Sequence, residues 1–197
     1  MKTFAAIDVG SYELAMKIFE ISSKNGIREI DYIRHRIDLG TDTFTTGKIS
    51  NERVDELCRV LRDYAGIMKN YRVDDYRAYG TSAIRETENT LIVLDQIAQR
   101  TGIRIEMLSN SEQRFLDYKS IASLGDAFSK TIEKGTAIVD IGGGSIQISL
   151  FDKDTLVTTQ NLRLGVLRLQ DQIGRLNLRH GQMEMVLEEI VNAQLMV

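Results

Sequence analysis

The sequence contains no proline and no tryptophan, and it has a single cysteine among 197 residues. One cysteine, Cys58, cannot form an intramolecular disulfide, and this favours a reducing compartment. Because proline is absent, no linker is marked by composition. A domain boundary must therefore be found from the pattern of apolar and polar residues.

Long apolar runs and concentrated positive charge are also missing. No run of about 18 apolar residues is present, and the N-terminal MKTFAAIDVG lacks the apolar core and cleavage site of a signal peptide. We therefore expect a cytoplasmic protein without a membrane segment. The formal net charge is −3 and there is no long basic run, so we expect no nucleic-acid binding.

The most informative stretch that is present is TAIVDIGGGSIQISL, residues 136–150. Two apolar runs flank three glycines, which predicts two strands joined by a tight turn. Consecutive glycines allow several backbone N–H groups to point at one anion. Asp140, at the end of the first strand, is placed to hold a divalent cation or to orient a water molecule. The simpler alternative is a glycine-rich hairpin with an incidental aspartate.

A second copy of this pattern occurs near the N-terminus. IDVGS at 7–11 repeats the order of DIGGGS at 140–145, with Asp8, Gly10 and Ser11 at the corresponding places. Two such hairpins could cradle one phosphate group, each with backbone donors and a carboxylate for a metal. Chance similarity of two short Gly-Ser turns is the alternative.

GTSAIRETEN, residues 80–89, lies between an expected strand at 76–79 and an expected helix at 91–100. Thr81 and Ser82 would stand at a helix N-terminus, and Arg85 can contact phosphate oxygens through two nitrogens. Taken alone, the segment is explained more simply by an ordinary helix cap with Arg85 in a salt bridge.

The remaining pattern alternates between strands and helices, which indicates an α/β protein. We expect further strands at 4–9, 14–21, 26–38, 103–108 and 156–164, and helices at 54–68, 109–124, 165–175 and 182–196. Segment 40–48 is expected to be a polar loop, and 125–135 the crossing between two domains. The last helix ends in the apolar AQLMV, so we expect a missing domain or a second copy in a homodimer to cover it.

Glu112 falls in the first turn of the helix expected from residue 109. There it can face the region where strand ends collect. A carboxylate in a first helical turn also favours the helix dipole on purely structural grounds. His35 and His180 are isolated from other ligand-type residues, so we expect neither to bind a metal.

The order IDVGS, GTSAIRETEN, SNSEQRFL, VDIGGGS and NLRLGVLRL resembles the exopolyphosphatase and guanosine pentaphosphate phosphatase family, Ppx/GppA. The resemblance implies an α/β fold of the actin-like (ribonuclease-H-like, ASKHA) type, with mixed sheets and flanking helices. It places a first domain at 1–124 and the beginning of an incomplete second domain at 125–197. It also implies Mg²⁺, or another divalent cation, as cofactor.

Carried onto this sequence, the resemblance assigns roles to particular residues. Metal binding falls to Asp8 and Asp140, and catalysis to Asp140. Glu112 falls on the first glutamate of the family's SGxEEARL pattern, and we expect it to be catalytic as a substitute for the base missing at position 113. Asn89 completes the TSAxRxxxN signature, and Gly165 and Arg168 match a later G-x-x-R-L segment. The substrate-binding residues it assigns are Gly10, Ser11, Thr81, Ser82, Arg85, Gly142, Gly143, Gly144 and Ser145.

The sequence also departs from the family pattern. Gln113 stands where SGxEEARL has its second glutamate, usually assigned as the base that activates water. An amide cannot accept that proton, and general-base catalysis usually contributes roughly 10²- to 10⁴-fold. Tyr12, Glu13 and Ala15 replace the Asn, Ser and Arg of the first loop, and Gln147 replaces a frequent glutamate.

Three interpretations stay open. The first is a phosphohydrolase that releases terminal phosphate from polyphosphate or (p)ppGpp, in which Glu112 would have to substitute for the missing base. The second is a degenerate family member that binds polyphosphate or a phosphorylated nucleotide as a sensor or regulatory module. A kinase or ATPase of the same fold is the third, and the TSAIRETEN segment counts against it.

Overall fold

The computed structural model describes residues 1–123, 125, 130, 135–153, 155–176 and 181–196. The chain divides into two compact units, Met1–Leu108 and Ser109–Val197.

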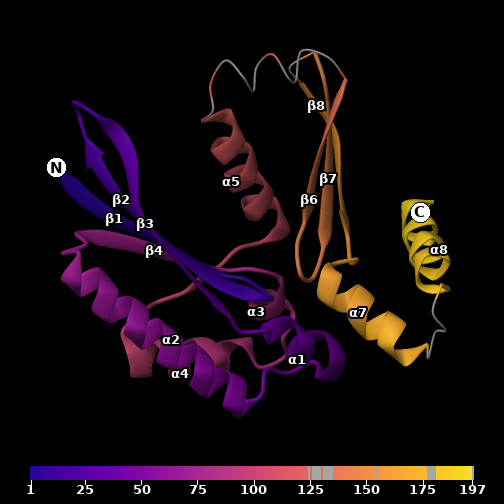
Figure 1. The fold of residues 1–197 in the computed structure, drawn as a ribbon, viewed down its shortest axis with the longest axis horizontal. Helices are drawn as coiled ribbons and strands as arrows, with labels where there is room; N and C mark the ends of the chain where they lie inside the picture. Colours follow the sequence, from indigo (N-terminus) through magenta and orange to yellow (C-terminus); the bar gives the residue numbers. More distant parts are fainter. Residues whose placement is uncertain (124, 126–129, 131–134, 154, 177–180, 197) are drawn as a thin grey trace. The chain divides into compact units, whose positions relative to one another are not determined.

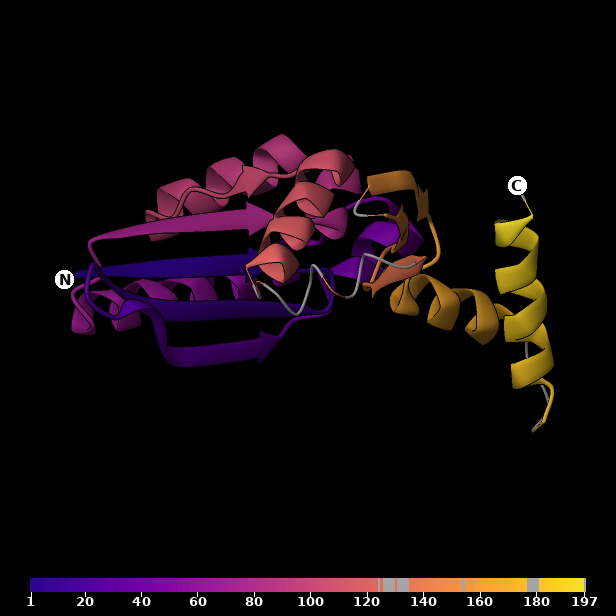
Figure 2. The same cartoon turned by 90° about the horizontal axis from the view of Figure 1, so that it is seen from above.

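The first unit is built on a five-stranded mixed sheet with the strand order β3-β2-β1-β4-β5. The first three strands are antiparallel neighbours, and β4 and β5 add in parallel beyond β1. Figure 2 shows β4 (magenta), β1 (indigo) and then β2 and β3 (purple) side by side. The strands are β1 (Lys2–Val9), β2 (Glu13–Ser22), β3 (Gly26–Arg36), β4 (Asp75–Gly80) and β5 (Glu106–Met107).

Two long helices, α2 (Asn51–Asn70) and α4 (Thr90–Thr101), pack together against one face of this sheet (Figure 1). Apolar residues recur every three or four positions in α2, so one stripe of the helix enters the core. The Ser50 hydroxyl caps α2 by accepting the N–H of Arg53. Two shorter helices complete the unit, α1 (Leu39–Thr46) and α3 (Ser82–Glu86).

The second unit contains a three-stranded antiparallel sheet in the order β6-β7-β8. Helix α5 (Asn110–Ala122) packs on it: the Tyr118 hydroxyl donates to Ser149 Oγ, and Arg114 Nη1 donates to Thr159 Oγ1 at 3.0 Å. The Tyr118 ring also meets Phe151 edge-on, with 5.5 Å between ring centres. The other elements are β6 (Thr136–Ile141), β7 (Ile146–Asp152), β8 (Thr155–Leu162), α7 (Val166–Arg175) and α8 (Met183–Leu195).

The two units share one motif, three antiparallel strands followed by a helix. In the first it is β1-β2-β3-α1, and in the second it is β6-β7-β8-α7. The strand register also agrees, because Asp8 pairs with Ala15 and Asp140 pairs with Gln147, each seven residues on. The internal repeat that the sequence predicted is therefore present in the backbone.

Two expectations about elements are wrong. Segment 40–48 was expected to be a loop, but most of it belongs to α1, which buries Leu39 and Thr43 and ends at Gly47 in the left-handed conformation. This helix is short and has few apolar residues, so it shows no clear periodicity. The strand expected at 103–108 pairs only over Glu106–Met107, although Ile103 is buried in the core.

Helix α5 lies in the second compact unit, whereas the predicted domains ended the first one at residue 124. The bonds from α5 to β7 and β8 account for this grouping. The domain boundary itself stays a prediction. Among the described residues, no helix combines the length and the apolar composition that a membrane crossing requires.

Candidate functional site

The glycine hairpin between β6 and β7 is hydrogen-bonded to the start of α7. The turn is closed by Gly142 N–H, which donates to the Ser145 carbonyl at 2.9 Å. The carbonyl groups of glycines 142, 143 and 144 then accept hydrogen bonds from Val166 N–H (3.0 Å), Leu167 N–H (2.9 Å) and Arg168 Nε (2.7 Å), respectively.

These hydrogen bonds fix the direction in which the backbone N–H groups of the loop point. The C=O and N–H of a trans peptide point in opposite directions, and the described residues contain no cis peptide. The N–H groups of Gly143, Gly144 and Ser145 therefore point away from α7. Those of Gly143 and Gly144 have no acceptor among the described residues. In nests and phosphate loops, N–H groups that point outward in this way bind an anion, and that role of Gly143 and Gly144 stays a prediction.

Gly165, at the N-cap of α7, explains why the helix can approach so closely. A Cβ atom on this residue would lie 2.3 Å from the carbonyl oxygen of Gly143 and 2.4 Å from the backbone nitrogen of Gly144. Only glycine permits this contact, because the obstructing atoms are backbone and cannot move aside alone. The G-x-x-R-L segment thus holds the loop through both its glycine and its arginine.

The hairpin of the first unit has the same turn. Gly10 N–H donates to the Glu13 carbonyl at 3.0 Å. The Ser11 hydroxyl is buried and accepts the N–H of Ala83 at 3.2 Å, while Thr81 N–H donates to the Val9 carbonyl at 3.2 Å. These bonds tie the hairpin to α3, so the structure brings the IDVGS and TSA segments together. The substrate contacts expected of Gly10, Ser11, Thr81 and Ser82 stay predictions.

Arg85, which the sequence left between a phosphate contact and a salt bridge, bonds mainly to backbone. Its Nη1 donates to the Leu108 carbonyl at 2.7 Å and its Nη2 to Ser82 Oγ at 3.4 Å. Burial of the guanidinium lowers the pKa of Arg85 from its ordinary value. The side chain is half-buried in the first unit, and its phosphate contact stays a prediction.

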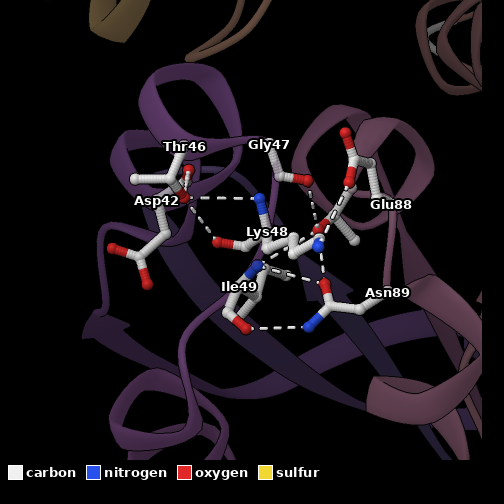
Figure 3. Close-up of polar contacts among 8 residues, drawn as sticks. Asp42, Thr46, Gly47, Lys48, Ile49, Glu88 and Asn89 are labelled. Atoms are coloured by element: carbon white, nitrogen blue, oxygen red, sulfur yellow. Dashed lines mark hydrogen bonds and ion pairs between the residues drawn. The ribbon is translucent and has the colours of Figure 1, made fainter.

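Asn89, the last residue of the signature, organises the connection between α1 and α2 (Figure 3). Its Oδ1 accepts Ile49 N–H at 3.1 Å, and its Nδ2 donates to the Ile49 carbonyl at 2.9 Å. The Thr87 hydroxyl also donates to Asn89 Oδ1 at 2.7 Å. In these contacts Asn89 replaces a backbone partner, which makes it a structural residue of the first unit.

Glu112 closes the start of α5. Its carboxylate accepts Ser109 N–H at 2.9 Å, and its own N–H donates to Ser109 Oγ at 3.2 Å, which is a capping box. Hydrogen bonds to the carboxylate from the side chain and the backbone N–H of Ser109 lower the pKa of Glu112. The carboxylate already has a structural role, and none of its contacts supports the catalytic one, which stays a prediction.

Between α5 and the three-stranded sheet lies a set of polar side chains that we call the polar layer. From the helix come Asn110, Gln113 and Asp117, spaced three and four residues apart and thus on one face. From the sheet come Asp140, Gln147 and Asn161, which are neighbours because Gln147 pairs with the other two across the strands.

Most of the polar layer is buried without partners. Gln147 is only 3% exposed, and neither its Oε1 nor its Nε2 has a hydrogen bond among the described residues. The same holds for one oxygen each on Asn110, Gln113, Asp117 and Asn161. Buried polar atoms are normally bonded, so a group of them in one place requires an explanation.

The pKa values of both carboxyl groups of the polar layer are raised. Burial raises the pKa of Asp117 to about 6, with a further contribution from the negative charge of Asp140. The pKa of Asp140 is also raised by desolvation, although its residue is among the exposed ones of β6. Sequence reasoning missed Asp117, which belongs to none of the motifs. The spacing of polar residues on α5 was the available signal.

The comparison with family models matches the Ppx/GppA phosphatase family over residues 18–195. The chain belongs to this family. Its fold is accordingly the actin-like (ASKHA) fold expected from the sequence, with mixed sheets and flanking helices.

Individual relatives of this Ppx/GppA chain are distant in sequence. It is 22% identical over 174 residues to a bifunctional 3-dehydroquinate synthase/phosphatase of Fusobacterium nucleatum, covering 85% of the chain and 26% of that protein. It is 24% identical over 164 residues to exopolyphosphatase 1 of Mycobacterium bovis, covering 83% of the chain and 46% of that protein. The chain thus spans half or less of these two proteins.

Among solved structures, an exopolyphosphatase from Cytophaga hutchinsonii superposes with a TM-score of 0.75 at 22% identity. The superposition covers 87% of this chain and 53% of that one. At this identity the likeness shows the fold.

Binding of a divalent cation stays a prediction, and the carboxylate and amide oxygens of the polar layer are ligands of the kind that Mg²⁺ takes. Among the described residues, no three His, Cys, Asp or Glu side chains form a metal-ligand group. A cation would therefore be held by few carboxylates, with amide oxygens and water completing its shell. Mg²⁺ is commonly bound in this way, through one or two carboxylates, and it keeps several waters.

Proposed function

We propose that the chain provides the phosphate-binding units of a Mg²⁺-dependent phosphohydrolase that releases terminal phosphate from polyphosphate or (p)ppGpp. The observation that carries the proposal is the pair of N–H donors of Gly143 and Gly144, fixed by α7 and located shortly after Asp140. Membership of the Ppx/GppA phosphatase family supports it. The exopolyphosphatases that the chain resembles support polyphosphate as a substrate.

In this proposal the loop N–H groups bind oxygens of the terminal phosphoryl group. Donors held in place before reaction stabilise the charge that develops there without reorganisation. Asp140 holds the cation in the second unit, and Asp8 has the corresponding place in the first. When bound, Mg²⁺ would neutralise charge on the phosphoryl oxygens.

The site lacks the carboxylate base that usually activates water in this family, because residue 113 is a glutamine. Phosphoryl transfer depends mainly on positioning and charge stabilisation, so turnover does not require a strong base. A missing base should nevertheless slow it by roughly 10²- to 10⁴-fold. Gln113→Glu should therefore raise the rate of phosphate release.

The direct test is release of orthophosphate from polyphosphate by the chain in the presence of Mg²⁺. Asp140→Asn should abolish it, and Asp152→Asn, at the exposed end of β7, should leave it unchanged. Full activity of Asp140→Asn would remove the proposed site. Polyphosphate binding without phosphate release, in both the chain and Gln113→Glu, would instead establish the non-catalytic binder.

Two further expectations belong to this proposal. A cytoplasmic location is supported by the buried free thiol of Cys58, which has no disulfide partner in the sequence. A second copy or a further domain over α8 is supported by exposed apolar side chains on that helix, Met183 and Met185 among them. Light scattering of the purified protein would distinguish a dimer from a monomer.

A further inference from the structure

We propose that the polar layer is a divalent-cation site in which Asp117, outside every motif of the sequence, supplies the second carboxylate beside Asp140. The inference deepens the proposed function, because it names the groups that would hold its cation. Its central claim is cation binding, which can be measured without substrate.

The first argument comes from the balance of donors and acceptors. Five unpartnered buried atoms of the polar layer are side-chain oxygens, and one is a nitrogen, Nε2 of Gln147. Because both amide atoms of Gln147 are unpartnered, reversing that amide does not change the balance. In the amide orientations of the structure, a single donor cannot satisfy five acceptors, and Asp117 Oδ2 is an acceptor in every orientation when ionised. The layer therefore favours a positively charged or donor-rich occupant.

The second argument is the kind of ligand that the layer offers. Asp140 pairs with Gln147, whose buried side chain has no partner among the described residues, and Asp117 Oδ2 is buried on α5. The layer therefore offers two carboxylates together with several amide oxygens. Carboxylate and amide oxygens are also the ligands that Mg²⁺ and Ca²⁺ take in proteins. The chemistry of the layer thus selects a hard cation.

The third argument is the orientation of α5. Arg114 and Tyr118 fix the rotation of the helix on the sheet through their bonds to Thr159 and Ser149. Asp117 lies one turn after Gln113 on the same face, and its Oδ2 is buried. Glu112, by contrast, is exposed and engaged in the capping box. Asp117 is therefore the α5 carboxylate that the helix presents to the sheet.

The experiment measures cation binding to the substrate-free chain by calorimetry with Mg²⁺ and by the electron paramagnetic resonance of Mn²⁺. Asp117→Asn should weaken binding at least about tenfold, because it removes one of two charged ligands. Asp152→Asn is the matched control, a change of the same kind on an exposed residue of the same sheet, and should bind normally. Gln113→Glu adds a carboxylate on the same helix face and should tighten binding.

Circular dichroism and thermal unfolding of each variant exclude loss of binding through unfolding. Unchanged affinity in Asp117→Asn, or no binding by the chain at millimolar cation, would overturn the inference. Cation binding lost in Asp117→Asn, together with no phosphate release by the chain, would support this site and count against the proposed activity. Phosphate release with cation affinity unaffected by Asp117→Asn would overturn the site alone.

Discussion

Replacing Gly165 with alanine tests the link between α7 and the phosphate loop. The added methyl group would lie 2.3 to 2.4 Å from backbone atoms of Gly143 and Gly144. Such a distance is about 1 Å shorter than an ordinary contact between non-bonded atoms. The start of α7 must therefore move away from the loop.

The expected cost follows from the contacts that this movement breaks. Overpacking against a well-packed site costs about 1 to 3 kcal/mol. The hydrogen bonds from Val166 and Leu167 to the loop carbonyls contribute about 1 kcal/mol each. We expect Gly165→Ala to lower the free energy of unfolding of the second unit by about 3 kcal/mol, and to weaken binding of polyphosphate.

Urea unfolding followed by circular dichroism measures the loss of stability, and hydrogen exchange at the amides of Val166 and Leu167 shows whether those two bonds open. Gly174→Ala is the control, because this glycine is in α7 and an added methyl group would meet nothing within 4 Å beyond the backbone of its own helix. It should be stabilised by about 0.5 to 1 kcal/mol, as for alanine in a helix interior. Equal stability of the two variants, with unchanged exchange, would refute the reasoning.

Three further predictions concern other parts of the chain. With a chelator present, Asp117→Asn should match the natural chain in stability near pH 4. Above pH 6 the Asp117→Asn variant should be more stable than the natural chain by at most about 3 kcal/mol. The reason is that the raised pKa of Asp117 makes ionisation of this carboxyl unfavourable in the folded state. Equal stability of the two proteins at pH 8 would contradict this. Asn89→Ala should lower the free energy of unfolding in urea by about 2 kcal/mol, since it leaves the Ile49 carbonyl without its partner. Asn70→Ala, a change of the same kind at an exposed residue, should lower it little. Ser109→Ala removes the cap of α5 and should lower stability by about 1 kcal/mol; no loss would mean that the capping box is unimportant.

The sequence was sufficient for the elements whose periodicity is strong. Alternating apolar residues around glycine predicted both hairpins, and apolar spacing with Ser50 as a cap predicted α2. Helix α1 was missed because its polar sequence gives almost no apolar stripe. The pattern of one segment is informative only when that segment buries a distinct face.

Of the candidate site, only the two glycine loops could be predicted from the sequence. The role of Asn89 depends on Ile49, which is 40 residues earlier in the chain. The polar layer depends on how α5 is rotated on the sheet, and tertiary bonds of Arg114 and Tyr118 decide that rotation. The spacing of polar residues on α5 marks one face of the helix, but only the folded structure shows that this face meets the sheet.

The hydrogen bonds from α7 to the carbonyl groups of the glycine loop have a consequence for ligand selectivity. A glycine-rich loop can in principle rotate whole peptide planes, and each such flip would present an oxygen where an N–H had been. With all three glycine carbonyls bonded to α7, a flip at any of them requires breaking a bond to the helix. The helix thus keeps the N–H groups of the loop directed away from it, which is the orientation that binding of an anion would require.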